Sequence, residues 1–366
     1  MPGHSRWIRQ SIEELERIRD IPMQRSGMYR MDRNERTWSF SDSVIDEIRR
    51  RISSETLTNY PEMEDIYHKL AVYLDVDDDQ IYFHSGSDLV IKSVFETYID
   101  KDDRVLMQNP SYAMYGVYGR MYGADIYEQD FKADLSFDID EYCESIARVE
   151  PKLVILENPS GYIGNSYTHE QVEQVIKTAV NSSSLILVDE AYIDYIPEAN
   201  VQDLISDYDN LIIVRTFSKA WGLAGMRAGY AVSNELLISE LFKVMPMHEL
   251  TSATVIAVDT VLDHASEMMD YIKDVADVRE YFLRELSDMG IMAIKSDTHF
   301  VTAAIGERLN AEDFRNKAHV SSFFVRRPFG QDILRNWVRI GLLPMEVMRG
   351  FVSFMKEYIR DGLKYT

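Results

Sequence analysis

The segment richest in chemical information is TFSKAWGLAGMRAGY, residues 216–230, where a Ser-Lys pair is followed by three glycines and an arginine. An amine that forms a Schiff base must reach its neutral form near neutral pH, which burial and nearby cations promote. A lysine at a strand end is often plain surface. Here Thr216, Ser218 and Arg227 add hydroxyls and a guanidinium, the groups that a phosphate requires. We therefore predict a Schiff base at Lys219 beside a phosphate site.

The elements that must position this lysine alternate along the chain. Short apolar runs predict buried strands at 80–84, 104–108, 153–156, 185–188 and 211–215, and amphipathic stretches predict helices at 87–98 and 169–180. Such βα units are typical of a mainly parallel sheet. Polar segments follow these strands, namely HSGSD, QNPSY, ENPSG, VDEAY and RTFSK. Because ligands bind outside the carboxyl ends of strands in open α/β sheets, we expect these segments to converge on one site.

The pattern changes after residue 250. A long helical stretch through 289 is followed by short strand candidates at 299–304, 321–325 and 337–340 and a final helix from Pro344, which indicates a smaller α+β domain. The predicted divisions are therefore 1–40 for an N-terminal arm and part of the small domain, 41–250 for a large domain, and 251–366 for the small domain. We expect the helix from Ser11 to pack on the small domain or on a partner subunit.

Together these motifs resemble the class I/II aminotransferases, and most of all the histidinol-phosphate aminotransferase family. The Ser-Lys pair followed by LAGMRAGY is the most specific match, and the resemblance extends from Asp32 to the C-terminal helix. It implies the pyridoxal-5′-phosphate (PLP) transferase fold of type I: a large domain with a mainly parallel sheet flanked by helices, plus a smaller α+β domain. It also implies that Lys219 carries PLP and shuttles protons, while Arg227 and Ser218 hold the cofactor phosphate.

The other cofactor residues follow from the resemblance. Asp189 could simply cap a helix, but beside Lys219 it is expected to pair with the ring nitrogen and maintain the ring as an electron sink. Tyr192 is expected to hydrogen-bond the ring 3′-oxygen, as is Asn158 in LENPSGYIGN. Tyr112 matches the aromatic residue that stacks on the ring. Gly86, Ser87 and Asp88 resemble the family's phosphate-binding turn, where a helix N-terminus favours an anion.

The resemblance also concerns partners and substrates. Tyr60 in LTNYPEME is similar to the tyrosine that reaches the neighbouring subunit's cofactor phosphate, which implies a homodimer. Arg339 is similar to the arginine that clamps the substrate α-carboxylate. Arg326 and Arg327 lie where phosphate-recognising relatives carry an arginine, although an Arg-Arg pair is most often solvated. Departures from the relatives occur at His299 and in VMPMHELTSA, at Met247 and His248.

Composition narrows the class of protein further. The formal net charge of −22 disfavours nucleic acid as a partner. The single Cys143 permits no internal disulfide, which fits a reducing cytoplasm. The chain carries neither a signal-peptide pattern nor an apolar run long enough to span a membrane. We expect a cytoplasmic protein with no membrane association.

The sequence also disfavours three other classes of protein, because it shows none of the features that they require. A PLP-binding regulator would need an appended basic segment, and a metalloenzyme would need histidines at ligand spacing. A nucleotide-dependent oxidoreductase would need a glycine fingerprint after its first strand. We therefore predict transfer of an amino group from a donor, expected to be glutamate, to a small phosphorylated or otherwise anionic substrate. Decarboxylation of a phosphorylated amino acid, as in threonine-phosphate decarboxylase, stays open, because a rotation of the bound amino acid changes which Cα bond breaks.

Overall fold

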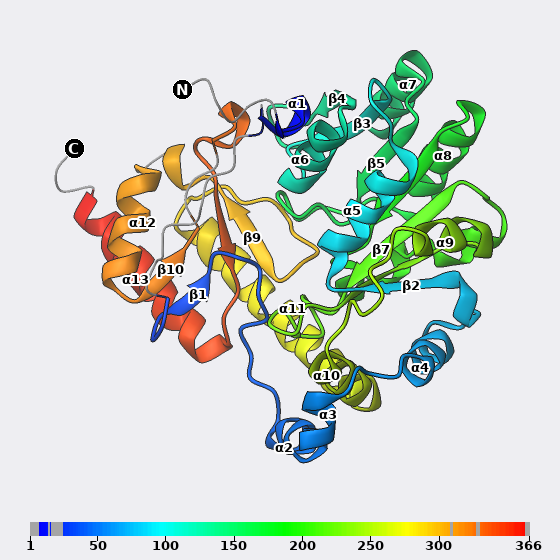
Figure 1. Cartoon of the computed structure of the whole chain (residues 1–366). Coiled ribbons are helices and arrows are strands. Elements are labelled where there is room, and N and C mark those ends of the chain that lie inside the picture. Colours follow the sequence, from blue (N-terminus) through cyan, green and yellow to red (C-terminus); the bar gives the residue numbers. More distant parts are fainter. Residues whose placement is uncertain (1–6, 14, 16–24, 308–309, 327–329, 363–366) are drawn as a thin grey trace.

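The computed structural model describes residues 7–13, 15, 25–307, 310–326 and 330–362, which form a large and a small lobe (Figure 1). The large lobe is built on a seven-stranded sheet with the order β2-β8-β7-β6-β5-β3-β4. Its strands are β2 (Ile81–His84), β3 (Arg104–Asn109), β4 (Asp125–Asp130), β5 (Leu153–Glu157), β6 (Leu185–Asp189), β7 (Leu211–Thr216) and β8 (Gly229–Val232). Within this sheet β8 runs antiparallel to both neighbours, and the pairs β3–β4, β3–β5, β5–β6 and β6–β7 are parallel.

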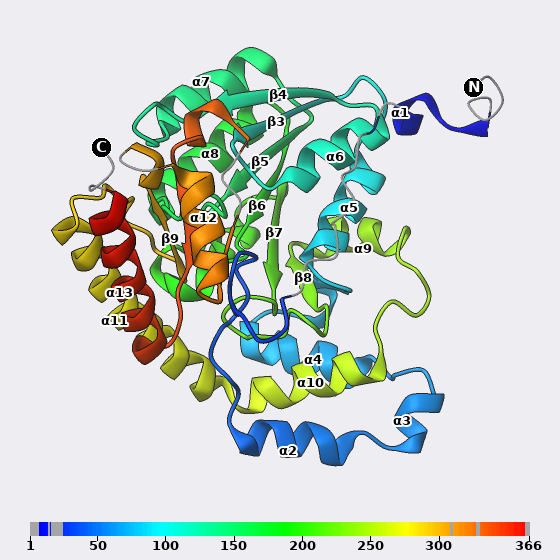
Figure 2. The same cartoon turned by 90° about the vertical axis from the view of Figure 1, so that its left-hand side faces the viewer.

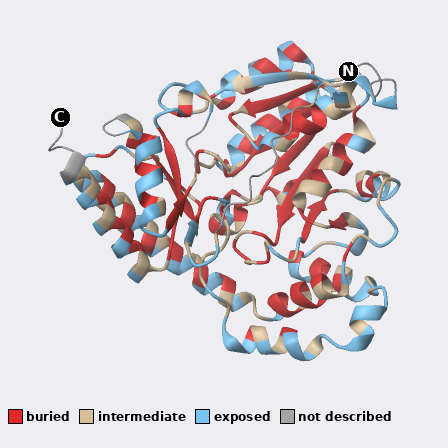
Figure 3. Cartoon of the chain, turned by 60° about the vertical axis from the view of Figure 1, so that its left-hand side comes forward, coloured by how far each residue is buried: buried red, intermediate tan, exposed pale blue. Residues whose placement is uncertain are grey.

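Helices cover both faces of this sheet (Figure 2). One face carries α5 (Ser87–Tyr98), α6 (Ala113–Tyr122) and α9 (Glu235–Phe242), and the other carries α7 (Ile139–Val149) and α8 (His169–Asn181). Alternate strand residues enter two separate apolar clusters, so that in β5 Leu153 and Ile155 face one layer of helices while Val154 and Leu156 face the other. Burial on both faces explains why the strands read as continuous apolar runs (Figure 3).

The small lobe contains two short sheets. In the first, β1 (Tyr29–Met31) pairs in parallel with β10 (Phe323–Val325), and in the second, β9 (Phe300–Ala303) pairs antiparallel with β11 (Val338–Gly341). The helices of this lobe are α12 (Ala311–Val320) and α13 (Met345–Gly362). Residues 29–31 therefore pair with a strand of the small lobe.

The predicted long helix after residue 250 is two helices, α10 (Ser252–Asp263) and α11 (Ala265–Asp288), which meet at His264. α10 packs against α2 (Asp42–Arg51), α3 (Ser54–Thr58) and α4 (Glu64–Leu74), whereas α11 packs against α13 and β9. The boundary placed at residue 250 stays a prediction, and the packing of α10 favours one near His264. The remaining short elements are 3₁₀ turns at Asp78–Gln80, Ile193–Tyr195, Pro197–Ala199, Gln202–Ser206, Ile305–Glu307 and Asp332–Leu334.

The N-terminal helix differs from its prediction. α1 (Gln10–Glu13) is a single turn whose Ser11 Oγ donates to Met121 O at 3.0 Å, at the end of α6. For these residues packing on the small domain is wrong, because the turn packs on α6 of the large lobe. The alternative, packing on a partner subunit, stays a prediction.

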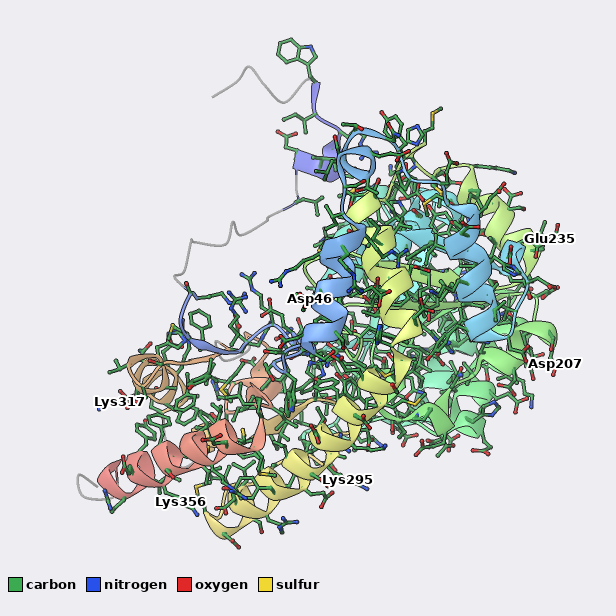
Figure 4. The ribbon with its side chains drawn as sticks, turned by 90° about the horizontal axis from the view of Figure 1, so that it is seen from below. Asp46, Asp207, Glu235, Lys295, Lys317 and Lys356 are labelled. Carbon is green, nitrogen blue, oxygen red and sulfur yellow. The ribbon has the colours of Figure 1, made fainter. Side chains whose placement is uncertain are left out.

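The charged side chains labelled in Figure 4 are exposed and point outward, namely those of Asp46, Asp207, Glu235, Lys295, Lys317 and Lys356. The interior of the sheet layers is correspondingly apolar. None of the described helices combines the length and the apolar composition that crossing a bilayer requires.

Candidate active site

A cavity of about 520 Å³ lies at the carboxyl ends of β5, β6 and β7, where the two lobes meet. The predicted residues that line it are Ser87, Asp88, Tyr112, Asp189, Tyr192, Thr216, Ser218, Lys219, Arg227, Arg326 and Arg339. Further lining residues that the sequence did not single out are Arg33, Asn34, Ala113, Glu157, Pro159, Gly161, Tyr162 and Ala191. The polar segments after the strands thus converge as the sheet topology requires.

Lys219 follows the end of β7 and brings its amine into this cavity. Its Nζ donates to Asn34 O at 3.1 Å and lies 5.3 Å from the centre of the Tyr192 ring. Both contacts are with neutral groups, so the amine is held by a carbonyl and an aromatic ring. This arrangement leaves a half-buried nucleophilic amine beside the strand ends.

Asp189 is the last residue of β6 and is almost fully buried. Its Oδ2 accepts from Tyr115 OH at 2.5 Å and its Oδ1 accepts from Ala191 N at 3.0 Å. Burial raises the pKa of this carboxyl, and the contacts with Tyr115, Ala191 and Lys219 oppose that rise. One donor for each oxygen fixes the orientation of the carboxyl group in the cavity wall.

Tyr192 depends on a residue from the far end of the sequence. Its hydroxyl accepts from Asn34 Nδ2 at 2.8 Å, a contact between residues 158 positions apart. Asn34 has a φ of 53°, in the left-handed region that asparagine tolerates better than most residues. Asn34 therefore meets Tyr192 through its side chain and Lys219 through its carbonyl.

The start of α5 forms a pocket for an anion. Gly86 has a φ of 92°, and a Cβ built there would lie 2.7 Å from Arg227 Nη2. A Cβ on Gly229 would lie 2.2 Å from Ser87 N, so β8 packs directly on this turn. The free N–H groups of a helix N-terminus and a guanidinium at that place suit a phosphate. Gly86 does not line the cavity, and the absence of a Cβ there leaves room for the Arg227 guanidinium.

Tyr112 stands at the N-terminus of α6 with its ring toward the cavity. Its hydroxyl donates to Asp88 Oδ1 at 3.2 Å, and its ring meets Tyr115 edge-on with centres 5.6 Å apart. Its backbone N–H donates to Glu157 Oε1. Tyr112 and Asp88 are thus coupled across the mouth of the anion pocket.

Asn158 in ENPSG is not among the residues that line the cavity. Its side chain is fully buried. Its Oδ1 accepts from Tyr167 N at 2.8 Å, and its Nδ2 donates to Tyr167 O at 3.3 Å. These bonds hold the loop to the following segment, and the predicted contact of Asn158 with a cofactor ring stays a prediction.

Glu157 is the charged residue of this segment that lines the cavity, and the sequence analysis missed it. It is the last residue of β5 and lies directly opposite Asp189 in the β5–β6 register. Its two oxygens accept from Tyr112 N and Gly161 N, the latter at 2.9 Å. Burial and the charge of Asp189 raise the pKa of this carboxyl to about 7. The sequence feature that could have identified Glu157 as a site residue is a charged residue at the end of an otherwise apolar strand.

Two arginines come from the small lobe. Arg339 Nη1 donates to Gly161 O at 2.6 Å and Nη2 donates to Asp32 O at 3.2 Å. Burial and the neighbouring charge of Arg326 lower the pKa of Arg339 to about 10, so the group is still cationic at neutral pH. The Tyr162 ring lies 5.9 Å from the Arg339 guanidinium carbon and 5.8 Å from that of Arg326. Arg327 lies outside the described residues.

Tyr60 does not reach this cavity within one chain. It is 71% exposed and its ring stacks on that of His248 with centres 3.7 Å apart. The departure from relatives at Met247 and His248 thus supplies the ring partner of Tyr60. A prediction that Tyr60 acts on a neighbouring subunit requires an exposed position of this kind.

His299 lies behind the cavity rather than in its lining. Its ring stacks between Tyr192 and Tyr195, with centres 5.7 and 5.1 Å away. Burial lowers the pKa of this imidazole to about 3, and the positive charges of Lys219 and Arg339 act in the same direction. His299 is therefore a neutral support for Tyr192.

The groups in this cavity fit PLP: an amine for its aldehyde, a buried carboxyl for its ring nitrogen and a glycine turn with an arginine for its phosphate. Such a set at the strand ends of a doubly covered parallel sheet defines a PLP-dependent enzyme of fold type I. The model of the family "Aminotransferase class I and II" matches residues 26–354. The chain belongs to this family and is a PLP-dependent aminotransferase.

A curated relative and two solved structures are similar to this chain. The histidinol-phosphate aminotransferase of Thermoanaerobacter pseudethanolicus is 33% identical over 276 residues, which are 75% of this chain and 77% of that protein. A crystal structure of the Sinorhizobium meliloti histidinol-phosphate aminotransferase with PLP has a TM-score of 0.88 at 22% identity and covers 98% of this chain and 99% of its own. The L-threonine-O-3-phosphate decarboxylase of Porphyromonas gingivalis has a TM-score of 0.77 at 18% identity, with 91% and 100% of the two chains covered. The last two similarities concern the fold.

Proposed function

We propose that the enzyme transfers the amino group of glutamate to a small phosphorylated or otherwise anionic substrate, as its histidinol-phosphate aminotransferase relatives do. The observation that carries this proposal is the placement of Arg339 and Arg326 on either side of Tyr162, in the same cavity as Lys219. Paired guanidinium groups suit carboxylate and phosphate equally. A substrate with an anion at each end matches this arrangement.

The residues around the lysine have distinct proposed roles. When bound, PLP supplies an electron sink for the charge that develops at the substrate Cα. Lys219 holds the cofactor and then moves the proton at that Cα. Asp189 is placed to pair with the ring nitrogen, Tyr192 with the ring oxygen, and Tyr112 covers one ring face. Two donors to Asp189 keep its carboxyl aimed before the substrate arrives.

The phosphate of the cofactor is assigned to the anion pocket at the start of α5. Arg227 supplies the charge there, and Gly86 leaves room for its guanidinium. Ser87, Thr216 and Ser218 supply hydroxyl groups that line the cavity, and Asp88 restrains Tyr112. The pocket is thereby separated from Arg339, which is left for the substrate.

Arg339 is assigned to the α-carboxylate of the amino donor. Arg326 is assigned to the distal anion, and Arg327 stays a second candidate for it. Transamination proceeds in two half-reactions through one cavity, so the donor's side-chain carboxylate and the acceptor's anion would use the same distal arginine. Arg33, which also lines the cavity, adds a third positive charge on that side.

A half-reaction tests the proposal and separates it from decarboxylation. Glutamate added without an acceptor should convert the cofactor absorbance to that of the pyridoxamine form. The second substrate is then tested in the reverse direction, with phosphorylated amino acids and amino alcohols added to the PLP form as amino donors. Release of carbon dioxide with no pyridoxamine form would replace the proposal with a decarboxylase.

The distal anion is tested by Arg326→Ala. We expect this variant to raise KM about 10- to 100-fold for a phosphorylated substrate, because a hydrogen-bonded charge pair is lost. The matched control is Arg335→Ala, since Arg335 is exposed and does not line the cavity. An unchanged KM in Arg326→Ala would exclude Arg326 and leave Arg327 as the candidate.

We further propose a cytoplasmic homodimer in which Tyr60 completes the partner's cofactor site. Support comes from the exposed stack of Tyr60 on His248 at a distance from the chain's own cavity. Mixing Lys219→Ala chains with chains carrying an inactivating Tyr60 substitution should restore one intact site in each heterodimer. Verified heterodimers without activity would contradict a shared site.

A further inference from the structure

Glu157 is the buried acid of the cavity to which the proposed roles give no task. It is 4% exposed, it ends β5, and its Cα partner in the sheet is that of Asp189. Two carboxyl groups therefore lie side by side at the ends of neighbouring strands. A second buried acid destabilises the protein unless bonds or a positive charge compensate for it.

The contacts of Glu157 join two loops that carry proposed site residues. One oxygen accepts from the backbone N–H of Tyr112, and the other accepts from that of Gly161 at 2.9 Å. Gly161 O in turn accepts from Arg339 Nη1 at 2.6 Å. The carboxylate thereby connects the residue that covers the ring face with the arginine assigned to the substrate carboxylate.

The strand end that carries Glu157 is itself fixed. Glu157 N donates to Gln108 Oε1 at 2.7 Å, and Gln108 Nε2 donates to Tyr167 OH at 2.8 Å. Both bonds are buried, and they hold the backbone of Glu157 in place at the end of β5. Both of its oxygens accept N–H groups, which is the pattern of an ionised carboxylate.

The charges that face Glu157 come from several elements. Asp189 of β6 disfavours its ionised form, and Arg339 of β11 favours it. The phenols of Tyr115, Tyr162 and Tyr167 also face it. Arg339 is the positively charged residue among these neighbours. A positively charged cofactor ring bound beside Asp189 would be a second positive charge near Glu157. A negative Glu157 and a cationic ring therefore stabilise each other.

We propose that Glu157 is a positioning residue of the aminotransferase site, whose negative charge favours the protonated cofactor and whose two bonds hold the Tyr112 and Gly161 loops in register. This role rests on the proposed arrangement of the site. It predicts two separable effects of the Glu157 side chain. Its negative charge acts on the protonation of the cofactor, and its hydrogen bond to Gly161 acts on the position of Arg339.

The test compares a neutral and a charged substitution in the reconstituted holoenzyme. Glu157→Gln keeps the size of the side chain but loses the charge, and its amide can accept only one of the two N–H groups. Glu157→Asp keeps the charge on a shorter side chain. We expect the pH midpoint of the cofactor absorbance change to fall by about one unit in Glu157→Gln, since a nearby negative charge is lost. The midpoint of Glu157→Asp should stay near that of the wild type.

A second neutral variant and a remote control complete the design. Glu157→Ala should lower the midpoint as Glu157→Gln does, and it provides the comparison if the glutamine variant does not fold. Both neutral variants should also raise KM for glutamate about 2- to 10-fold, because the support of Gly161 is weakened. Glu141→Gln, exposed on α7, should change neither quantity.

Two results would overturn this role. One is a neutral variant whose midpoint coincides with that of the wild type. The other is an aspartate variant whose midpoint falls as far as that of the glutamine variant, because charge would then not be the cause. A wild-type protein with no cofactor absorbance at all would instead overturn the site as a whole, so the two failures are distinguishable.

Discussion

The two halves of the cavity are built in different ways. The half assigned to the cofactor comes from residues 87–227, and its side chains stand at the ends of neighbouring strands of one sheet. The half assigned to the substrate joins Arg33 and Asn34 to Arg326 and Arg339 of the small lobe. Arg339 bonds Asp32 O across 307 positions of sequence. Sheet register thus fixes one half, whereas the meeting of two lobes fixes the other, so substrate choice can change while cofactor chemistry is retained.

The largest effect is expected in the cofactor half, from Asp189→Asn. An amide cannot stabilise a protonated ring nitrogen as a carboxylate does, and activity should fall on the order of 10²- to 10³-fold with cofactor still bound. Activity and cofactor content are measured together, with Asp125→Asn on the exposed edge strand β4 as control. Near-normal turnover would remove Asp189 from its proposed role.

A smaller effect is expected in the substrate half, from Arg339→Lys. Lysine keeps the charge but loses the planar fork that now bonds Gly161 O and Asp32 O. KM for glutamate should rise about 10- to 100-fold, while the cofactor absorbance stays that of the wild type. The exposed Arg335→Lys serves as control. A changed cofactor spectrum with an unchanged KM would show that Arg339 belongs to the cofactor half and not to the substrate half.

The smallest expected effect is a change in acid stability at His299, which lies behind the cavity and stacks on Tyr192. Its pKa is lowered by burial to about 3 in the folded chain, so below about pH 6.5 the unfolded chain binds the extra proton. Stability from this residue is therefore lost as the pH falls from about 6.5 toward 3. Between about pH 7 and pH 5, His299→Asn should lose about 2 kcal/mol less free energy of unfolding than the wild type.

Urea unfolding at the two pH values provides the measurement for His299. His84, whose pKa burial lowers to about 4, titrates in the same direction in both proteins and cancels in the comparison. The exposed His68→Asn is the control. Equal acid sensitivity of His299→Asn and the wild type would show that His299 is not held neutral.

The sequence predicts the cofactor half well because its signals are local. Each predicted strand of the large lobe is present, and each is followed by the polar segment that lines the cavity. β4 was missed because it is an exposed edge strand of mostly polar residues, and β8 because it lies within the segment that follows the lysine. The polar composition of β4 hides it from a search for apolar runs, whereas β8 is itself a buried apolar run that was included in the lysine motif.

Orientation at a strand end is harder to predict than the strand itself. Glu157 and Asn158 are consecutive, and only the turn after β5 decides which of them faces the cavity. Asn34 gave no signal because its partners, Tyr192 and Lys219, lie far away in the sequence. The assignments to Arg326 and Arg339 came from a family resemblance, since spacing alone does not bring the small lobe to the sheet.

The central claim is that Lys219 carries the cofactor. Borohydride reduction of the holoenzyme, followed by peptide mapping, measures this directly. We predict a pyridoxyl mass on the peptide that contains Lys219, whose Nζ lies in the cavity 3.1 Å from Asn34 O. A label on any other lysine, or none after reconstitution with PLP, would contradict the account.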